Sequence, residues 1–370
     1  MQTIGLGLIG TGFMGRAHAL AFHNAQAAFD LPLAVRPLLV ADANPAKARD
    51  CAQAWGFEGA AESWQALVAD PRIGLVAITT PNLLHHPMAL AALAAGKAVY
   101  CEKPLATTFA EATAMRDAAR AAGVVTRVGY NYQQNPTLLL AQQLIASGEL
   151  GEITGFTGDF SEDFMADPAG AFTWRCLAEQ GGGALADLGS HLLALTRLLL
   201  GDVAAVCADL HHCHRQRPAE GGGTRAVEVD DQAHVLVRLA NGARGTLGTS
   251  WLRHGRKNRL AFEVNGTRGT LCYDQERLNE LRLFRAQPGQ LLQGFQTLLA
   301  GPHLPAYAAF CPAAGHQLGY NELKTLEVRG LIEALAGRAA PGVDFEEAWQ
   351  IERLGAACRT SAAEQRWVTL

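Results

Sequence analysis

The sequence predicts an α/β fold of two domains, a doubly wound parallel sheet followed by an α/β domain with a mostly antiparallel sheet. The chain has 370 residues, which is more than one hydrophobic core of ordinary size accommodates. Apolar β-like runs alternate with alanine-rich amphipathic stretches up to about residue 132, and β-type segments then follow one another closely. We therefore expect one domain over residues 1–131 and a second over residues 132–370.

In the first domain, strands are expected where the sequence reads as continuous apolar runs, because helices then cover both faces of the sheet. These runs are residues 3–10, 35–42, 73–79, 97–101 and 124–130. Helices are expected over the amphipathic stretches 13–28, 44–55, 83–95 and 109–122. Alternation of this kind gives parallel strands joined by right-handed crossovers.

In the second domain, we expect a helix over 136–147, a strand over 152–161 and a helix over 184–200. The β-type segments after them are residues 203–210, 233–240, 243–251, 259–264, 269–274 and 281–284. Asn241-Gly242 and Asn265-Gly266 separate two pairs of these segments, and Asn-Gly between apolar runs is a strong hairpin signal. Helices over 321–337 and 344–364 are expected to close the chain.

The composition is that of an ordinary globular protein, with 49% hydrophobic residues, 18% charged residues and a net charge of −4. This balance argues against a nucleic acid or an anionic membrane as the main partner. The eight cysteines form no CxxC pair, which is typical of reduced thiols. The first apolar run has no basic leader and the stretch 192–200 is too short for a membrane span, so we expect a cytoplasmic protein.

A glycine-rich turn follows the first expected strand. The pattern GxGxxG occurs twice, at Gly5, Gly7 and Gly10 inside the strand, and at Gly10, Gly12 and Gly15 where the strand gives way to the first helix. Only the second copy has the strand–turn–helix context of a dinucleotide site. There the free N–H groups and the dipole at the helix N-terminus favour a pyrophosphate.

Asp42 ends the second expected strand. A carboxylate at this place can accept hydrogen bonds from an adenosine ribose, and it repels a 2′-phosphate. Ala43 and Asn44 offer no cation instead, so NAD is favoured over NADP. The alternative is that Asp42 caps the helix that follows.

Two further segments follow strands at their carboxyl ends, where open α/β folds bind ligands. Asn82, in Thr80-Pro81-Asn82, either contacts a cofactor or caps helix 83–95, and the local sequence leaves both open. The segment CEKPLA, residues 101–106, places Lys103 between a glutamate and a proline. Most lysines are surface residues without a function, so a role for Lys103 depends on what converges on it.

Asp187 and His191, in GGGALADLGSH, lie four residues apart, a spacing that puts both on one face of a helix. A carboxylate beside an imidazole can orient it, fix its tautomer and raise its basicity. The alternative is an ordinary solvated pair. The strongly apolar flanking residues favour a half-buried site.

The run HHCH at 211–214 raises the question of a metal site. Its ligands are too crowded for tetrahedral coordination, and the later partners of a zinc pattern are absent. We expect this run to start a polar hairpin that continues through RQRPAEGGGT, and we expect no metal.

Five motifs, in this order and spacing, resemble the Gfo/Idh/MocA oxidoreductases, the family of glucose–fructose oxidoreductase and inositol dehydrogenase. They are GTGFMG, TTPNLLHH, CEKPLA, VGYNYQQNP and GGGALADLGSH, and the similarity extends over essentially the whole chain. The resemblance implies an NAD-binding Rossmann domain and an α/β domain with an open sheet, through which the protein forms a homodimer or homotetramer. It also implies a small sugar or polyol as substrate.

Carried over onto this chain, the family's EKP lysine matches Lys103, and its DxGxH pair matches Asp187 and His191. The resemblance implies that Lys103 hydrogen-bonds the reacting oxygen and stabilises developing alkoxide charge. His191 is then the general base for the hydroxyl proton, and Asp187 orients it. Inositol-dehydrogenase-like members often continue SHxxD where this chain has Ala194, which does not favour myo-inositol.

The resemblance and the motifs together give the full set of predicted contacts. The predicted cofactor contacts are Gly10, Gly12, Phe13, Met14, Asp42, Thr80, Asn82, His85, Glu102, Lys103 and Asn131. The predicted substrate contacts are Lys103, Tyr130, Trp174, Arg175, Asp187, His191 and His316. The alternative to substrate contact is a salt-bridged Arg175 beside a core Trp174, and for His316 it is a surface loop residue without a role.

The sequence therefore predicts an NAD-dependent dehydrogenase that oxidises a secondary hydroxyl of a cyclic polyol or sugar, either an inositol, a pyranose or an anhydro-sugar. The alternatives are an NAD-dependent glycosidase on the same scaffold and a non-catalytic dinucleotide-sensing regulator. The presence of Lys103, Asp187 and His191 speaks against the regulator. The glycosidase is harder to separate, because its reaction also begins with hydride abstraction.

Overall fold

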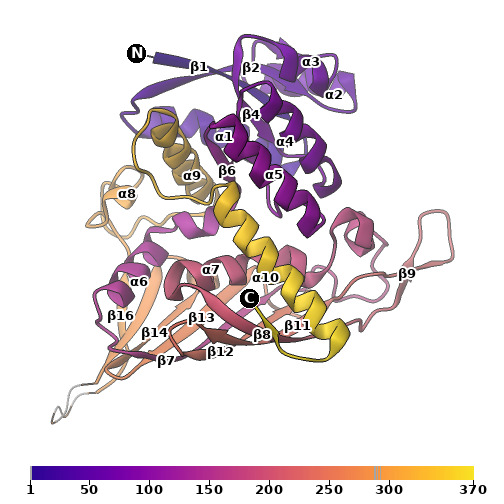
Figure 1. Ribbon diagram of the computed structural model, residues 1–370. Helices are drawn as coiled ribbons and strands as arrows, with labels where there is room; N and C mark the ends of the chain where they lie inside the picture. Colours follow the sequence, from indigo (N-terminus) through magenta and orange to yellow (C-terminus); the bar gives the residue numbers. More distant parts are fainter. Residues whose placement is uncertain (1, 287–288, 290, 292) are drawn as a thin grey trace. The chain divides into compact units, whose positions relative to one another are not determined.

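The computed structural model describes residues 2–286, 289, 291 and 293–370, and it divides into two compact units (Figure 1). Unit 1 comprises Met1–Asn135 and Gly319–Glu352, and unit 2 comprises Pro136–Leu318 and Arg353–Leu370. Two helices near the C-terminus therefore contribute to the first unit, one wholly and one in part. The expected domain boundary between residues 131 and 132 stays a prediction.

Unit 1 is built on a six-stranded sheet with the order β3-β2-β1-β4-β5-β6, and its strands pair in parallel. The strands are β1 (Gln2–Ile9), β2 (Leu33–Ala41), β3 (Gly59–Ala60), β4 (Ile73–Ile78), β5 (Ala98–Cys101) and β6 (Thr126–Val128). The strand order reverses between β1 and β4, the switch point at which doubly wound sheets bind ligands. The predicted Rossmann sheet is confirmed.

Helices cover both faces of this sheet, because successive residues of β1 face helices on opposite sides. The helices are α1 (Phe13–Ala28), α2 (Pro45–Ala54), α3 (Trp64–Ala69), α4 (His85–Ala94), α5 (Phe109–Ala122), α9 (Tyr320–Leu335) and the first part of α10 (Phe345–Glu364). Leu6 belongs to a core shared with Phe22 of α1 and Leu331 of α9. A side chain at the next position, Gly7, would meet Leu67 of α3 on the opposite face.

Local sequence sets the ends of these helices. Asn44 caps α2 with its side chain, and Pro45 occupies the first helical position. Thr108 and Glu111 form the capping box of α5, and Gly123 ends that helix in the left-handed conformation. The sequence did not predict β3 and α3, because two strand residues and six helical residues are too few to show a period.

Unit 2 is built on a nine-stranded sheet with the order β16-β15-β14-β13-β7-β12-β11-β8-β17. The strands are β7 (Ile153–Ser161), β8 (Val203–His211), β11 (Gln232–Leu239), β12 (Arg244–Ser250), β13 (Arg259–Gly266), β14 (Gly269–Asp274), β15 (Glu280–Arg285), β16 (Gln296–Leu299) and β17 (Val368–Thr369). β7 and β12 pair in parallel and the other described pairs are antiparallel, which confirms the predicted mostly antiparallel sheet.

The two Asn-Gly hairpins differ in outcome. Asn241-Gly242 connects β11 to β12 as expected, and Gly242 has a φ of 92°. The turn between β13 and β14 lies two residues later than expected, at residues 267–268, because Asn265 and Gly266 are still part of β13. A Cβ at Gly266 would lie 2.2 Å from the Leu150 backbone oxygen, so this glycine permits a close backbone approach and not a turn.

The helices α6 (Pro136–Ala146) and α7 (Ser190–Leu200) lie on one face of the second sheet (Figure 1). On the other face, residues of β7, β13, β14 and β15 line a groove of about 390 Å³. β9 (Gln216–Pro218) and β10 (Thr224–Ala226) form the predicted polar hairpin, and α8 (Pro305–Ala308) is a short helix. An oligomer interface on the open face of this sheet stays a prediction.

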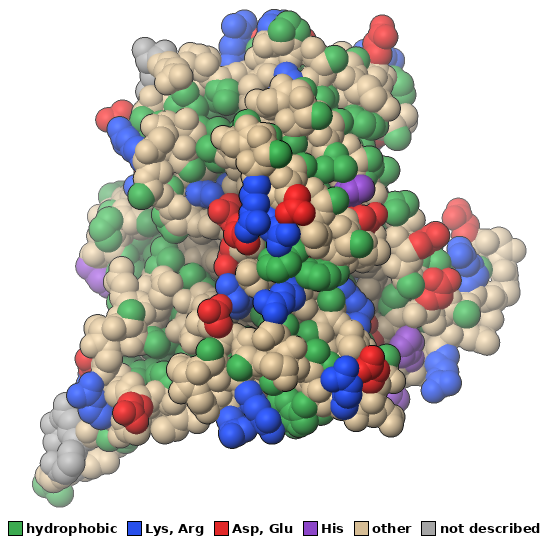
Figure 2. Space-filling model, in the orientation of Figure 1, with side chains coloured by type: hydrophobic (Ala, Val, Ile, Leu, Met, Phe, Trp, Pro, Cys, Tyr) green, Lys and Arg blue, Asp and Glu red, His purple; other side chains and the backbone are tan. Residues whose placement is uncertain are grey.

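The surface charge and the apolar helices relate to two partners considered above, nucleic acids and membranes. Acidic and basic side chains are interspersed on the face shown in Figure 2. Among the described residues, the helical stretch Ala178–Leu200 is long and apolar enough to cross a membrane. Because 72% of its apolar window is buried inside the protein, it has the character of a core helix.

Candidate active site

The glycine turn joins β1 to α1 in unit 1. Gly10 has a φ of 103°, and a Cβ there would lie 2.8 Å from the backbone oxygen of Thr79. A Cβ at Gly15 would lie 2.1 Å from the backbone oxygen of Gly10, so glycine permits close packing of helix against strand. Around Gly12, the N-cap of α1, nothing lies within 4 Å of the Cβ position. The start of α1 thus leaves room for a pyrophosphate on its N–H groups.

Asp42, one residue after β2, is held by the glycine turn. Its carboxylate accepts hydrogen bonds from the Thr11 amide at 2.9 Å, the Thr11 hydroxyl at 2.5 Å and the Asn44 amide at 2.9 Å. Burial alone raises the pKa of Asp42, but these hydrogen bonds outweigh it and the net pKa is lowered. The capping alternative is wrong, because Asn44 is the N-cap of α2. The oriented carboxylate fits an adenosine ribose.

The loop after β4 is tied together by a buried histidine. His85 lies between the backbone oxygens of Pro104, at 2.9 Å from Nδ1, and of Thr80, at 3.1 Å from Nε2. Burial lowers its pKa, which the two backbone oxygens only partly offset. Asn82 does not cap α4, whose N-cap is Leu84. Contacts of Thr80, Asn82 and His85 with the cofactor stay predictions.

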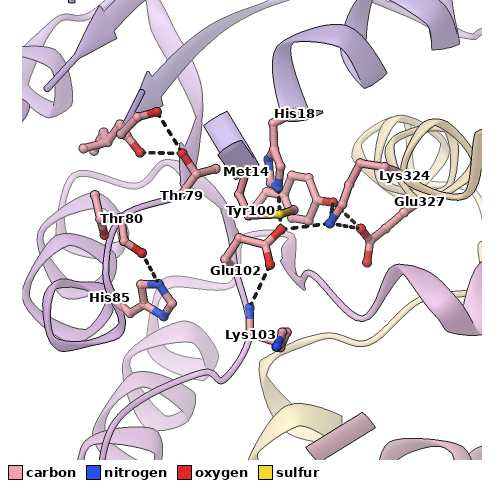
Figure 3. A network of polar contacts seen from close by, with 12 residues as sticks. Met14, His18, Thr79, Thr80, His85, Tyr100, Glu102, Lys103, Lys324 and Glu327 are labelled. Atoms are coloured by element: carbon pink, nitrogen blue, oxygen red, sulfur yellow. Dashed lines mark hydrogen bonds and ion pairs between the residues drawn. The ribbon is translucent and has the colours of Figure 1, made fainter. Parts of the chain in front are cut away.

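Glu102 follows β5 and is engaged on both carboxylate oxygens (Figure 3). Oε1 lies 2.7 Å from Nε2 of His18 and 2.8 Å from Nζ of Lys324, and Oε2 accepts the Lys103 amide at 3.2 Å. Burial raises the pKa of Glu102, but Lys324 and His18 outweigh it and the net pKa is lowered. A Cβ at Gly129 would lie 2.6 Å from this carboxylate, so glycine makes room for it.

The remaining predicted contacts of unit 1, to the cofactor and, for Tyr130, to the substrate, lie near the starts of two helical segments. Phe13, the first residue of α1, is 75% exposed, and the Met14 sulfur accepts the Tyr320 hydroxyl at 3.3 Å. Tyr130 and Asn131 follow β6 and are buried. The side-chain amide nitrogen of Asn131 has no hydrogen-bond partner among the described residues, which fits a polar group of a bound nicotinamide.

Asp187 and His191 of unit 2 belong to a helical stretch that is not a uniform α-helix. Leu185–Gly189 is a π-helical turn, and α7 continues from Ser190. Such turns often occur at functional sites, and they change which side chains share a face. His191 is 5% exposed and its ring meets Phe160 edge-on, with 5.7 Å between centroids. The wholly solvated pair is therefore wrong for His191.

Arg175 connects the Trp174 segment to Asp187. Its Nε lies 3.7 Å from Asp187 Oδ2, and its guanidinium stacks on the rings of Trp174 and Phe164. Trp174 is 37% exposed, so the alternative of a core tryptophan is wrong, whereas the salt-bridged arginine is present. Both side chains offer the aromatic face and the planar donors that sugar hydroxyls and sugar rings contact.

Asp230, which the sequence analysis did not single out, holds the start of this helical stretch. Its buried carboxylate accepts the Leu185 amide at 2.8 Å, and its backbone oxygen accepts the Ala184 amide at 2.9 Å. Burial raises its pKa to about 6, which the backbone hydrogen bonds only partly offset. Asp230 thus satisfies the helix N–H groups two and three residues before Asp187.

Two further candidates lie elsewhere in unit 2. His316 is exposed, and its Nδ1 lies 3.2 Å from the Ala313 backbone oxygen in a loop before α9. Its contact with substrate stays a prediction. In the HHCH run, the Cys213 and His214 amides donate to the carboxylate of Asp231. Among the described residues, no group of three or more His, Cys, Asp or Glu side chains is arranged to hold a metal ion.

Three residues beside the motifs escaped the sequence analysis: His18, Asp230 and Lys324. The partners that His18, Asp230 and Lys324 meet on other elements are distant in sequence, so local spacing does not indicate those pairs. Lys324 and Glu327 did carry a signal, because two charges stand among Leu323, Leu326 and Val328 on the buried side of α9. Charged residues within an apolar stretch indicate either a pair or a site.

Comparison with known proteins assigns these features. The sequence model of the oxidoreductase family with an NAD-binding Rossmann fold matches residues 4–130, and that of the GFO/IDH/MocA C-terminal domain matches residues 138–272. The fold and the cofactor residues thus define an NAD-binding oxidoreductase. The chain belongs to the Gfo/Idh/MocA family, as its motifs predict.

The relatives include enzymes that act on sugars. A levoglucosan dehydrogenase of Pseudarthrobacter phenanthrenivorans is 36% identical over 100% of this chain and 98% of its own length. A structure of a levoglucosan dehydrogenase with NADH and levoglucosan has a TM-score of 0.96 over 100% of this chain and 99% of that one, at 36% identity. An NAD-binding oxidoreductase from Klebsiella pneumoniae is 42% identical, with a TM-score of 0.95 over 99% of both chains.

These findings confirm the predicted family, the α/β fold, NAD as cofactor and the dehydrogenase class of the enzyme. The residues of unit 1 fit that cofactor, because the glycine turn, Asp42 and the unsatisfied amide of Asn131 lie at the carboxyl edge of one parallel sheet. The individual residue roles, the oligomeric state and the cytoplasmic location stay predictions.

Proposed function

We propose that this protein is an NAD-dependent dehydrogenase that oxidises a secondary hydroxyl of a cyclic sugar or polyol, with an anhydro-sugar as the favoured substrate class. The observation that carries the proposal is the full-length similarity to a levoglucosan dehydrogenase in a chain that has Lys103, Asp187 and His191 in matching motifs. Ala194, in place of the SHxxD aspartate, speaks against myo-inositol.

The proposed chemistry divides the reaction between a few side chains. Bound NAD supplies the acceptor for the hydride that leaves the carbon. Lys103 donates a hydrogen bond to the substrate oxygen and stabilises the negative charge that develops on it. His191 accepts the hydroxyl proton as general base, and Asp187 orients the imidazole.

The surroundings of each group support its role. His191 is nearly buried beside Phe160, so few water molecules compete for its imidazole. Trp174 and Arg175 remain partly exposed, as groups that contact a bound sugar must be before it arrives. Lys103 is positioned by a residue, Glu102, that is fixed in the core of unit 1.

The test is NADH formation by the purified protein on a panel of anhydro-sugars, aldoses and cyclic polyols, with NADP in parallel. Lys103→Ala and His191→Ala are expected to lower kcat by about 10²–10⁴-fold, the range for loss of a general base or an electrostatic stabiliser. Lys257→Ala and His23→Ala, two exposed positions away from these motifs, serve as matched controls with unchanged turnover.

The outcomes separate the competing functions. Turnover of one sugar class that both variants lose, while they still bind NAD, supports the proposal. If the protein binds NAD but none of the panel reduces it, the dehydrogenase proposal fails, and release of a glycoside leaving group is then measured to test the glycosidase. Retention of full turnover by either variant overturns the role given to that residue.

A further inference from the structure

Five ionisable or polar side chains are packed together in the core of unit 1, next to Lys103. The Lys324 cluster consists of His18 of α1, Tyr100 of β5, Glu102, and Lys324 and Glu327 of α9. Figure 3 shows Lys324 reaching from α9 to the Glu102 carboxylate, with His18 coming from α1. Lys324 is 0% exposed, and the other four members are also buried.

Lys324 is the cation at the centre of this cluster. Its Nζ donates to Glu102 Oε1 at 2.8 Å, to Glu327 Oε2 at 2.8 Å and to the Tyr100 hydroxyl at 3.2 Å. Tyr100 in turn donates to Glu327. All three protons of the ammonium therefore have an acceptor.

Glu102 passes the effect of Lys324 on to two functional segments. Its Oε1 binds His18, which lies on the helix that begins at the glycine turn. Its Oε2 binds the backbone amide of Lys103. One carboxylate thus fixes both the first helix of the cofactor site and the backbone of the predicted catalytic lysine.

Stability alone does not account for this arrangement. Removing two or more charges from water costs several kcal/mol per ion, and well-packed apolar residues in place of a buried ion pair are often neutral or stabilising (by about 1–4 kcal/mol). The neighbouring core of α1, α9 and the sheet is apolar and shows that such packing is available here. The buried charges lie where the chain places Lys103, at the carboxyl end of β5.

We propose that Lys324 is a positioning residue for the reaction: it holds Glu102 in place as a carboxylate, and Glu102 fixes the backbone of Lys103. This inference rests on the proposed function, in which Lys103 contacts the reacting oxygen. Lys324 itself touches neither substrate nor cofactor in this scheme. It acts through Glu102.

The first test replaces Lys324 by methionine and uses a second buried lysine of unit 1 as the matched control. Lys97 is also buried, but its Nζ donates to the backbone oxygens of Asp70 and Ile73, away from Lys103. Both variants, Lys324→Met and Lys97→Met, are expected to lower Tm. Lys324→Met is expected to lower kcat about 10–100-fold with KM for the sugar within about threefold, because a misplaced group costs on this scale. Lys97→Met keeps kcat within twofold.

A second test needs no turnover. The titratable side chains that act directly on His18 are Tyr100, Glu102 and Lys324. Tyr320 and Glu327 interact in turn with Glu102 and Lys324. The pKa of His18 is lowered to about 4: burial is the largest cause, Lys324 contributes to the lowering, and Glu102 opposes it. In apo Lys324→Met the cation is gone and the carboxylate remains, so NMR titration of the His18 ring is expected to show a higher pKa. An unchanged titration contradicts the proposed link.

A third test remains informative if Lys324→Met does not fold. Glu102→Gln removes the charge through which Lys324 acts, so adding Lys324→Met to Glu102→Gln is expected to lower kcat by less than twofold more. A further loss of tenfold or greater overturns the proposal. If Lys103→Ala keeps its turnover, the proposed function has failed. If Lys103→Ala is inactive but Lys324→Met has native kcat, only this inference has failed.

Discussion

Each of the two predicted catalytic segments has a backbone amide bound by a buried carboxylate, Glu102 in unit 1 and Asp230 in unit 2. The two carboxylates differ in what compensates their burial. Glu102, next to Lys103, has a buried ammonium and an imidazole as partners, and its net pKa is lowered. Asp230, which holds the start of the Asp187–His191 stretch, is bound mainly by peptide N–H groups, and burial raises its pKa to about 6. A full counter-charge therefore compensates burial in unit 1, whereas backbone dipoles compensate it only in part in unit 2.

This difference separates the two segments in their sensitivity to pH. The lowered pKa of Glu102 keeps it a carboxylate at neutral pH, so the Lys103 amide keeps its hydrogen-bond acceptor. Asp230 gains or loses its proton near pH 6, so the start of the helical stretch changes its electrostatics in a physiological range. The predictions below test this contrast, from the largest expected effect to the smallest.

The largest effect on stability is expected from Glu102→Gln. This change breaks a buried ion pair and leaves Lys324 with Glu327 as its remaining carboxylate partner, which costs about 4 kcal/mol of unfolding free energy. Urea unfolding followed by circular dichroism measures it. Glu327→Gln is the matched control and is expected to cost less than half as much, because burial already raises the pKa of Glu327. Equal losses would show that the two carboxylates are equivalent.

The second largest effect is a gain in stability, expected from Asp230→Asn. Because the folded pKa of Asp230 is about 6 and the unfolded value is about 4, its ionisation destabilises the folded state. The penalty is absent below pH 4, grows as pH rises to 6 and is constant above that, reaching about 3 kcal/mol. Asp230→Asn keeps an acceptor for the Leu185 amide, so it should unfold at a higher temperature than the native protein at pH 7.5.

The pH dependence provides the control for that comparison. Asp231 and Arg359 also act on Asp230, and both are retained in Asp230→Asn. The difference in Tm between the two proteins is expected to shrink towards zero as the pH is lowered to 4. A difference that is the same at pH 4 and pH 7.5 rules out the ionisation of Asp230 as its cause.

The smallest stability effect is expected from Arg175→Met. The Arg175–Asp187 contact of 3.7 Å is partly exposed, and such pairs contribute about 0–1 kcal/mol. If Arg175 contacts the substrate as predicted, KM for the sugar rises at least fivefold while kcat changes less. Steady-state kinetics and Tm on the same preparation separate the two roles. A native KM would place Arg175 outside the substrate contacts.

Prediction from sequence succeeded where a property is local. The glycine turn, the apolar strands and the amphipathic stretches are each visible within a short segment, so α1 and α5 begin and end at the expected positions. Asp42, expected as the last residue of the second strand, lies one residue after the end of β2. The motifs with Lys103, Asp187 and His191 were recognised as short, ordered patterns.

The missing features depend on long-range pairing or on small energy differences. Lys324 meets Glu102 across 222 positions in the sequence, and Asp230 meets Leu185 across 45, so the topology and not the local pattern brings them together. The π-helical turn at Leu185–Gly189 differs from an α-helix by one hydrogen-bond step, which residue periodicity does not resolve. The exposure of a side chain such as Trp174 likewise could not be predicted from the sequence, because it depends on the folded structure.

The contribution of α9 to unit 1 has a consequence for biosynthesis. Residues 1–135 leave the ribosome long before Val328, Leu331 and Ile332, which complete the core on one face of their sheet. Lys324, the ammonium partner of Glu102, is likewise synthesised about two hundred residues after it. A nascent N-terminal sheet therefore has an apolar face that α9 does not yet cover, and its Glu102 has only His18 and the Lys103 amide as partners until the chain has returned to it.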